Sequence, residues 1–304
     1  MDLSIVIVSW NTCQFLKQCM TSLYAAPPTC QFEVFVADNG SYDGSVEMVK
    51  RLFPQVRLFE NRRNLGFAEG NNLAIHHSSG RLVLLLNPDT EVRPGAVDRL
   101  VRFMDEQPRV GAAGARLLNP DGSLQISCYP SPTLARELWR LFHLDRFYPY
   151  AAYPMDVWQL DAPRFVDVLM GACLVLRRAV LDQVGLLDEA YFMYSEEVDL
   201  CYRVHKAGWK LAWVPQAQVV HHGGRSTQQV ANEMFLRLYE GKIRYFRKHY
   251  GGVVVLVYKL ILGAASLGRI LLAPFAGFFQ PSQRQRHLKL FHNYRRLLLA
   301  LPEM

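Results

Sequence analysis

Three carboxylates crowd into the segment Tyr194-Ser195-Glu196-Glu197-Val198-Asp199-Leu200-Cys201, whose other side chains are mostly apolar. Ionised groups held this close in a low-dielectric pocket repel one another and raise each other's pKa. Such an arrangement suits a general base, or a site for a metal ion and a phosphate. The alternative is a plain helix start, in which Ser195 is the N-cap and Asp199 pairs with Arg203. The segment alone favours the helix start, so the rest of the sequence has to decide.

Composition narrows the class of protein. The chain has 304 residues, half of them hydrophobic, which suffices for one large domain or a domain with an appendage. Its six cysteines form no CxxC pair, which argues against a zinc site or a disulfide framework and favours free thiols in a reducing cytosol. The N-terminus runs straight into a strand-like segment and lacks the features of a signal peptide. We therefore expect a cytoplasmic protein.

The positive charge is confined to the C-terminal quarter. Residues 1–224 carry 21 Lys and Arg against 24 Asp and Glu, whereas residues 225–304 carry 13 against 3. The same quarter holds the apolar stretch 253–279, which Lys259 and Arg269 interrupt. These two residues and Ser266 fall within a narrow arc of a helix, which favours an amphipathic helix in a membrane interface over a clean membrane span. The alternative is a buried terminal helix.

Strand and helix patterns alternate in the first third of the chain. Short apolar runs rich in β-branched residues predict buried strands over 3–9, 32–37 and 82–86, with a weak strand at 57–59. Helical periodicity covers 12–24 and 43–53, with Asp43 as N-cap of the second. Alternation of this kind predicts an α/β fold with a doubly wound, mostly parallel sheet.

Polar residues follow three of these predicted strands. Ser9-Trp10-Asn11 ends the first, Asp38-Asn39-Gly40-Ser41 the second and Asn87-Pro88-Asp89 the fourth. Such sheets bind ligands beyond the C-terminal ends of their strands. Asp38 is then either a turn cap or a ligand for a nucleobase or ribose, and Asp89 either a turn residue or a carboxylate for a divalent metal on a diphosphate.

The second half is less regular. Residues 129–162 are rich in Pro and aromatics with little periodicity, and we expect a mobile flap or an acceptor-side insertion. Strand character returns over 166–177 and 210–220, a short helix is expected over 179–184, and a long helix over 228–250. Neither a GxGxxG motif after the first strand nor a Walker loop is present, which counts against a dehydrogenase and a P-loop enzyme.

The order of the motifs is more specific than any one of them. Ser-Ile-Val-Ile-Val-Ser-Trp-Asn, Val-Ala-Asp-Asn-Gly-Ser, Asn-Leu-Gly-Phe-Ala-Glu-Gly-Asn-Asn, Leu-Leu-Asn-Pro-Asp-Thr, Tyr-Ser-Glu-Glu-Val-Asp-Leu and Val-His-His-Gly-Gly-Arg-Ser appear in series. Over residues 3–250 the chain resembles family 2 inverting glycosyltransferases of the GT-A fold. The most similar group is the rhamnosyltransferase-like enzymes of bacterial O-antigen and polysaccharide assembly.

The resemblance implies roles for individual residues. Asn87-Pro88-Asp89 takes the place of the family's DxD motif, with Asn87 as a departure, and Glu197, or alternatively Glu196, takes the place of the catalytic base. His221 corresponds to a metal ligand of some relatives, so Mg²⁺ or Mn²⁺ would be held by Asp89 and His221. The residues expected to line the nucleotide-sugar pocket are Ser9, Asn11, Asp38, Asn64, Gly66, Asn71, Asn87 and Asp89. Those expected on the acceptor side are Gly171, Ala172 and Asp199.

The resemblance also implies a reaction. A sugar, by resemblance rhamnose, would move with inversion from a nucleotide-diphosphate sugar to a hydroxyl of a saccharide or lipid-linked saccharide. Two alternatives are a nucleotidyltransferase, which would want a Gly-rich basic loop after the first strand, and a non-catalytic nucleotide-sugar-binding assembly subunit. The basic tail lacks a nucleic-acid-binding motif, and we expect no nucleic-acid partner.

The expected organisation has two parts. Residues 1–250 would form the GT-A domain, with a nucleotide-sugar-binding half at 1–115 and an acceptor and catalytic half at 116–250. Residues 251–304 would form a basic, apolar helical tail that contacts the inner face of the cell membrane peripherally. The sequence leaves the donor, the acceptor, the linkage and the oligomeric state open.

Overall fold

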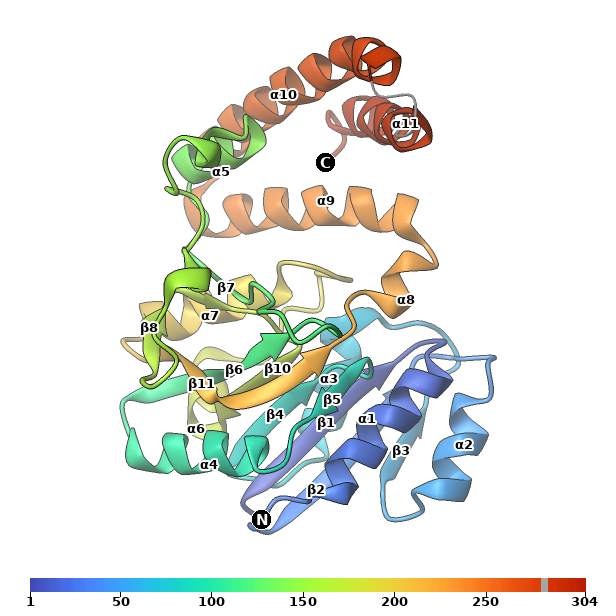
Figure 1. The fold of residues 1–304 in the computed structure, drawn as a ribbon, viewed down its shortest axis with the longest axis vertical. Coiled ribbons are helices and arrows are strands. Elements are labelled where there is room, and N and C mark those ends of the chain that lie inside the picture. Colours follow the sequence, from blue (N-terminus) through green and yellow to red (C-terminus); the bar gives the residue numbers. More distant parts are fainter. Residues whose placement is uncertain (280–283) are drawn as a thin grey trace. The chain divides into compact units, whose positions relative to one another are not determined.

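The computed structural model describes residues 1–279 and 284–304 (Figure 1). Its internal contacts divide the chain into two compact units. Unit 1 comprises Met1–Ser131 and Pro154–Gln229, and unit 2 comprises Pro132–Tyr153 and Val230–Met304. The expected boundary between residues 250 and 251 stays a prediction, and residues 280–283 of the expected tail lie outside the described residues.

Unit 1 is built on a mixed sheet whose strand order is β3-β2-β1-β4-β10-β6-β11-β5, with β8 also paired to β11. The strands are β1 (Leu3–Ser9), β2 (Phe32–Asp38), β3 (Arg57–Glu60), β4 (Leu82–Leu86), β5 (Thr90–Val92), β6 (Val110–Leu118), β8 (Arg164–Val166), β10 (Cys173–Arg177) and β11 (Lys210–His221). A separate two-stranded sheet joins β7 (Cys128–Tyr129) to β9 (Val168–Leu169).

The sheet is parallel in its N-terminal half and changes direction at β10. Strands β1 and β2, β1 and β4, and β2 and β3 pair in parallel, as their short apolar runs predict. Strand β10 runs antiparallel to both β4 and β6. The predicted central sheet flanked by helices is therefore confirmed, while its C-terminal half is mixed because β10 enters between two strands from the opposite direction.

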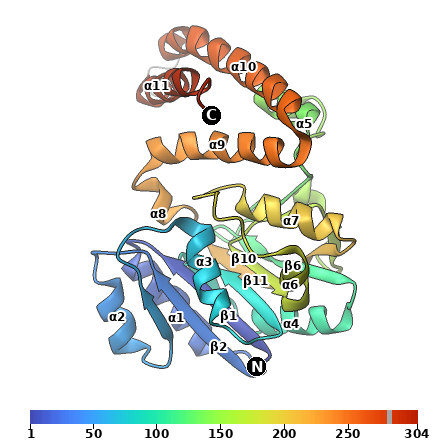
Figure 2. The same cartoon turned by 180° about the vertical axis from the view of Figure 1, so that it is seen from behind.

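Helices cover both faces of this sheet. Leu3, Ile5 and Ile7 of β1 pack into one core with residues of α1 (Cys13–Ala25), α2 (Ser45–Leu52) and α4 (Ala96–Glu106), which lie in front of the sheet in Figure 1. The opposite face, turned to the viewer in Figure 2, carries α3 (Gly66–His76), α6 (Arg178–Val184) and α7 (Glu196–Lys206). Unit 1 also contains the 3-10 turn η2 (Met155–Val157) and the short helix α8 (Arg225–Gln228). The doubly wound arrangement is as predicted.

The parallel strands bring their carboxyl ends to one edge. Ser9 of β1 is in register with Asp38 of β2, and β4 ends at Leu86 just before Asn87. After β1 the chain builds β2 and β3 on one side and β4 on the other, which opens the ligand crevice typical of such sheets.

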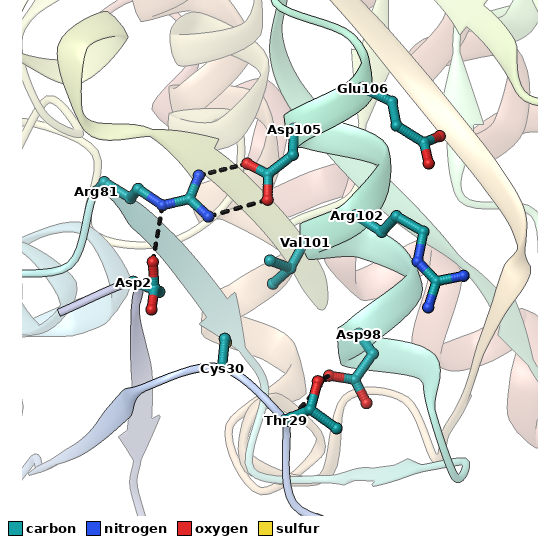
Figure 3. Close-up of a pocket in the computed structure, with 9 residues that line it drawn as sticks. All are labelled: Asp2, Thr29, Cys30, Arg81, Asp98, Val101, Arg102, Asp105 and Glu106. Carbon is teal, nitrogen blue, oxygen red and sulfur yellow. Dashed lines mark hydrogen bonds and ion pairs between the residues drawn. The ribbon is translucent and has the colours of Figure 1, made fainter.

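A hollow of about 520 Å³ lies at the other edge of the sheet (Figure 3). Asp2 and Arg81, which line it, immediately precede β1 and β4. The Arg81 guanidinium donates to Asp2 at 3.0 Å and to Asp105 at 2.9 Å. These ion pairs tie the strand starts to α4, so the hollow is remote from the residues expected to act in chemistry.

Helix α7 is fixed by a buried ion pair. Asp199 has no exposed surface and accepts a hydrogen bond from Arg203 Nε at 2.8 Å. Arg203 also donates to the carbonyl oxygens of residues 184, 185 and 186. The pairing of Asp199 with Arg203 is as the helix-start interpretation predicts, and the enclosed carboxylate holds the helix that carries Glu196 and Glu197. The expected place of Asp199 on the acceptor side stays a prediction.

Unit 2 consists of helices in the described residues. They are α5 (Leu134–Leu141), the 3-10 turn η1 (Leu144–Arg146), α9 (Ala231–Tyr250), α10 (Gly252–Phe279) and α11 (Arg284–Ala300). The buried carboxylate of Glu137 in α5 binds Lys242 of α9 at 3.1 Å and accepts from Tyr258 of α10 at 3.4 Å. This cluster connects three helices that are distant in sequence.

Two expectations concern this region, and the role of residues 129–162 as a flap or acceptor-side insertion stays a prediction. The segment 129–162 contains α5, because Thr133 accepts a hydrogen bond from Arg136 N–H and caps a short amphipathic helix. The predicted helix 228–250 is present as α9, which begins at Ala231, and Gln228 instead ends the short helix α8. In the described residues one stretch, Gly252–Leu272 of α10, has the length and apolarity to cross a membrane, and 28% of it is buried.

We expect Asp199→Ala to lower the free energy of unfolding by about 3–5 kcal/mol, because it leaves the Arg203 guanidinium without its buried partner. The matched control is Glu60→Ala, which removes an exposed ion pair with Lys50 and should change stability by less than about 1 kcal/mol. Urea unfolding followed by circular dichroism measures both. Equal losses in the two variants would contradict the anchoring role of Asp199.

Candidate active site

Asp38 sits at the edge with half of its carboxylate unused. Its Oδ1 accepts a hydrogen bond from Ser41 N–H at 2.8 Å, whereas Oδ2 is buried and has no partner. Burial raises the pKa of Asp38. Asn11 lies opposite, in the left-handed region at φ 50°, and its Oδ1 accepts from Tyr42 N–H while its Nδ2 is also buried without a partner. The two side chains offer an acceptor and a donor to a ligand.

A network of three asparagines forms the neighbouring wall. Asn39 donates to Asn64 Oδ1 at 3.2 Å and to the Gly66 carbonyl at 2.9 Å, and it accepts from Asn61. Gly66 has φ 81°, and a side chain there would come within 2.3 Å of the Phe192 carbonyl oxygen. Only glycine allows this close approach. Asn64 and Gly66 thus join the first half of unit 1 to the loop that precedes α7.

Two residues expected in the nucleotide-sugar pocket make internal bonds instead. The Ser9 hydroxyl is fully buried and bonds to Thr12 Oγ1 at 3.0 Å. Asn71 donates to the Phe67 carbonyl of its own helix at 2.8 Å. The neighbouring Asn72 holds Leu187 through both its amide nitrogen and its carbonyl oxygen. These bonds hold the side chains in the wall of the crevice, and the expected contacts of Ser9 and Asn71 with a ligand stay predictions.

Asp89 is buried beside His221. Its Oδ1 lies 3.3 Å from His221 Nε2, and its Oδ2 accepts from Arg225 N–H at 3.2 Å. Burial raises the pKa of Asp89, but the hydrogen bond and charge of His221 outweigh it, and the net pKa is lowered. Asn87 Nδ2 lies 3.3 Å from the same His221 nitrogen. The Asn87-Pro88-Asp89 turn therefore presents an ionised carboxylate next to an imidazole.

The tautomer of His221 follows from Gln125. Gln125 Nε2 donates to Asn119 Oδ1 and to the His221 carbonyl, so its Oε1 is left as an acceptor. This Oε1 lies 2.7 Å from His221 Nδ1, which must then carry the proton. Nε2 therefore faces Asn87 and Asp89. It shares its proton with Asp89 when the ring is charged, and in the neutral ring its lone pair is available to a metal ion.

Arg225, whose backbone N–H binds Asp89, adds a positively charged side chain to this part of the site. Two left-handed glycines, Gly223 and Gly224, turn the chain after β11 so that the Arg225 guanidinium lies over the Phe15 ring at 4.8 Å. Its Nε is buried without a hydrogen-bond partner. Gln229 then donates to the Asn11 carbonyl at 2.8 Å, so the segment around α8 extends from Asp89 to the end of β1. A guanidinium in this position suits an anionic ligand.

The tight turn before β10 lies next to the acidic pair Glu196-Glu197 and to the carboxyl-terminal edge of the sheet. Gly171 packs between Phe67 and Glu197, and a side chain there would lie 3.4 Å from the first and 3.7 Å from the second. The next carbonyl, of Ala172, accepts from Asn87 N–H at 2.9 Å. Gly171 and Ala172, expected on the acceptor side, thus connect Glu197 to the Asn-Pro-Asp turn.

Helix α7 begins at Glu196 after two residues with positive φ, Tyr194 at 70° and Ser195 at 73°. Ser195 is the N-cap residue as the helix-start interpretation predicts, but its side chain makes no capping hydrogen bond. Non-glycine residues in this conformation store strain, which is typical of functional sites. Here the strain sets the direction of the two carboxylates at the helix N-terminus.

Burial shifts the pKa of both Glu196 and Glu197. Burial and the charge of Glu197 raise the pKa of Glu196 well above its ordinary value. Burial also raises the pKa of Glu197, and the backbone groups of residues 195, 197 and 198 act in the opposite direction. Each carboxylate keeps one buried oxygen, Oε2, without a hydrogen-bond partner. Glu197 is the more exposed of the two, which suits it as a base.

The edge formed by the carboxyl ends of the strands has the polar groups that a polar ligand needs. Five of its buried side-chain atoms lack a hydrogen-bond partner in the described part of the chain, and they are Asn11 Nδ2, Asp38 Oδ2, Glu196 Oε2, Glu197 Oε2 and Arg225 Nε. An unpaired buried polar group costs about 1–3 kcal/mol. Such groups are tolerated where a ligand will pair with them.

Three residues of this site were not among those expected from the sequence. Arg225 belongs to the Val-His-His-Gly-Gly-Arg-Ser motif, and its position after two glycines was the available signal for a phosphate contact. Asn39 follows Asp38 directly and could have been grouped with it. Gln125 gave no local signal, because its partner His221 is 96 residues away.

Comparison with known proteins decides the family. The sequence matches the model of glycosyl transferase family 2 over residues 4–156 and that of glycosyl transferase family group 2 over residues 82–301. It is 35% identical over 240 residues to the N-acetylglucosaminyl-diphospho-decaprenol L-rhamnosyltransferase of Mycobacterium tuberculosis, covering 74% of this chain and 77% of that one. This chain is a family 2 glycosyltransferase. It transfers a sugar from a nucleotide sugar, as the motif series predicted.

Two further similarities agree with this assignment. The glycosyltransferase is 27% identical to the low-salt glycan biosynthesis hexosyltransferase Agl10 of Haloferax volcanii over 225 residues, covering 73% of this chain and 67% of the relative. The mannosyltransferase PcManGT of Pyrobaculum calidifontis, solved with GDP-Man and Mn²⁺, superposes with a TM-score of 0.58 at 16% identity over 97% of this chain and 86% of that one. The predicted GT-A fold is confirmed.

The raised pKa of Glu196 predicts how stability depends on pH. In the unfolded chain this group titrates near 4.5, so the folded state holds its proton more tightly, and stability is lost as the pH rises from about 4.5 through the raised value. Glu196→Gln should therefore raise the melting temperature at pH 8, by roughly 2–4 °C per kcal/mol regained, and leave it nearly unchanged at pH 4.

Glu106→Gln, at the exposed end of α4, is the matched control and should show no such difference between the two pH values. Differential scanning calorimetry of both variants gives the measurement. A Glu196→Gln variant that melts lower than the wild type at pH 8 would show that the Glu196 charge is compensated in the folded enzyme.

Proposed function

We propose that the enzyme transfers a single sugar, with rhamnose as the first candidate, from a nucleoside diphosphate donor to a hydroxyl of a lipid-linked saccharide, with inversion at the anomeric carbon. The observation that carries the proposal is that the turn before β10 contacts both parts of the site: its Ala172 carbonyl accepts from Asn87 N–H of the Asn-Pro-Asp turn, and its Gly171 packs against Glu197 of α7. A base held close to a diphosphate site is what a single displacement needs.

The nucleotide end would bind at β1 and β2. Asp38 Oδ2 and Asn11 Nδ2 are the unpaired acceptor and donor there, and they suit the hydroxyl and carbonyl groups of a nucleoside. Asn39 and Asn64 keep the adjacent wall rigid through their amide network. Arg225 would neutralise charge on the departing diphosphate, because its guanidinium is already oriented by the Phe15 ring.

The residues present fit a divalent metal. Among the described residues no three His, Cys, Asp or Glu side chains are grouped closely enough to form a metal site by themselves. Asp89 and the Nε2 lone pair of His221 supply two ligands, which leaves room for diphosphate oxygens and water. A mixed oxygen and nitrogen set suits Mn²⁺ better than Mg²⁺. When bound, the ion would withdraw electron density from the leaving diphosphate.

Glu197 would act as the base. Its unpaired oxygen would accept the proton of the acceptor hydroxyl as that oxygen attacks the anomeric carbon. The raised pKa of Glu196 favours its protonated form, which would limit the negative charge beside the base. A single base suffices and no covalent enzyme intermediate is required.

The name of one relative supports the acceptor class that we propose. The mycobacterial relative is named for a saccharide on decaprenyl diphosphate, and a lipid-linked saccharide of this kind is the acceptor we propose. Such an acceptor would place the reaction at the cytoplasmic face of a membrane. The six cysteines, all free, are compatible with a reducing compartment.

A donor screen tests the proposal directly. Purified enzyme with Mn²⁺, a lipid-linked N-acetylglucosamine and a panel of nucleotide sugars should release nucleoside diphosphate fastest from dTDP-rhamnose. Glu197→Gln should lower kcat by roughly 10²–10⁴-fold and leave the Kd for the nucleoside diphosphate within a few fold, since the lost group acts in proton transfer. Glu106→Gln serves as the matched control with full activity.

The outcomes separate the alternatives. Binding of nucleotide sugars without turnover in the wild type would favour a non-catalytic subunit. Full turnover in Glu197→Gln would reject this residue as the base, and Glu196→Gln would then be assayed in the same way.

We expect Gln125→Ala to weaken Mn²⁺ binding by roughly 10–100-fold, because His221 loses the partner that fixes its tautomer. Electron paramagnetic resonance of free Mn²⁺, in the presence of nucleoside diphosphate, measures this without turnover. Gln216→Ala, on the same strand as His221, is the control. Unchanged Mn²⁺ affinity in Gln125→Ala, alongside a loss in His221→Ala, would refute the positioning role of Gln125.

A further inference from the structure

Helix α10 carries an apolar strip on its outer side. Val253, Leu256, Leu260, Leu267 and Leu271 are spaced by three, four, seven and four residues, so they fall on one side of the helix. They are 78%, 60%, 65%, 52% and 69% exposed, respectively. We call this set the apolar face of α10. Contiguous exposed apolar surface of this kind marks an interaction site.

The two charged residues of α10 are turned away from this face. Lys259 Nζ donates to the Pro302 carbonyl at 3.3 Å. Arg269 donates to the Ala265 carbonyl at 3.2 Å and lies over the Tyr294 ring at 5.1 Å. Both cations are therefore occupied inside unit 2, and the apolar face contains no charge.

The opposite side of α10 is committed to packing. Val255, Tyr258, Leu262 and Ala265 are buried, and the Tyr258 ring lies 4.8 Å from that of Phe246 in α9. If α10 crossed a bilayer, this side would have to leave its contacts with α9 and carry Lys259 and Arg269 into hydrocarbon. The packing favours a helix that lies along a surface.

The charge of the residues around α10 indicates what kind of surface its apolar face contacts. From residue 241 to residue 302 the sequence contains eleven Lys and Arg and no Asp or Glu. Exposed members on the flanking helices are Arg244 and Lys248 of α9 and Lys289, Arg295 and Arg296 of α11. A uniformly cationic region attracts anionic phospholipid headgroups. A second copy of this chain would bring the same sign of charge and be repelled.

We propose that the apolar face of α10 inserts into the interface of a bilayer rich in anionic phospholipid, with the helix parallel to the membrane plane. The flanking Lys and Arg residues engage the headgroups, and the buried side of α10 stays packed in unit 2. The inference does not depend on which sugar is transferred, and vesicle binding tests it without turnover.

The experiment uses the full chain and vesicles of phosphatidylglycerol mixed with phosphatidylcholine, or of phosphatidylcholine alone, in a flotation assay. The wild type should bind the anionic vesicles and be released by high salt. The double variant Leu256→Glu with Leu267→Glu should bind at least about 100-fold more weakly, because two charges replace inserted side chains. Val157→Glu, exposed to 72% in unit 1, is the matched control and should bind like the wild type.

Several results would overturn the proposal. These are absence of wild-type binding, equal binding by the double variant, and wild-type protein that remains in vesicles through high salt and alkaline extraction as a spanning helix does. A dimer that the double variant converts to a monomer would assign the face to a second copy. Melting curves verify folding, and a second pair, Leu260→Gln with Leu271→Gln, repeats the assay should the first pair unfold.

Discussion

The candidate site depends on the position of one antiparallel strand, β10, within the sheet. Strand β10 enters beside β4 with Cys173 opposite Leu86, so the turn before β10 meets the turn after β4. The hydrogen bond from Asn87 N–H to the Ala172 carbonyl fixes this meeting at 2.9 Å. Gly171, one residue earlier, then packs against Glu197. A fully parallel sheet would send the start of β10 to the other edge, away from the turn after β4.

Preorganisation of this edge has an energetic cost that the rest of unit 1 offsets. Buried oxygens of Asp38, Glu196 and Glu197 lack partners, and two successive residues before α7 have positive φ. Each feature destabilises the free enzyme by an amount comparable to a lost hydrogen bond. The continuous core beneath the sheet and the Asp199–Arg203 pair stabilise the elements that carry these residues. Stability is thus given up where a ligand restores the missing interactions.

The two units differ in the kind of surface that they present. Unit 1 concentrates paired and unpaired polar groups at the carboxyl ends of its strands. Unit 2 buries the Glu137–Lys242 pair, exposes Lys and Arg side chains on α9 and α11, and exposes apolar side chains along α10. An amphiphilic acceptor has both characters in one molecule, with a saccharide at one end and a lipid at the other. The division of chemistry in the chain corresponds to this division in the proposed acceptor.

Local sequence determined the elements and the family. Runs of β-branched and leucine residues specified β1, β2 and β4, because strands buried on both faces need continuous apolarity. The polar residues after those strands located the edge, and the motif series identified a GT-A glycosyltransferase. Only the tertiary structure assigned the individual side chains. It showed that Asn71 bonds its own helix, that Asp199 is enclosed, and that Gln125 orients His221 across 96 residues. The Gln125–His221 pair leaves no local pattern in the sequence, since the fold alone brings these two residues within 3 Å.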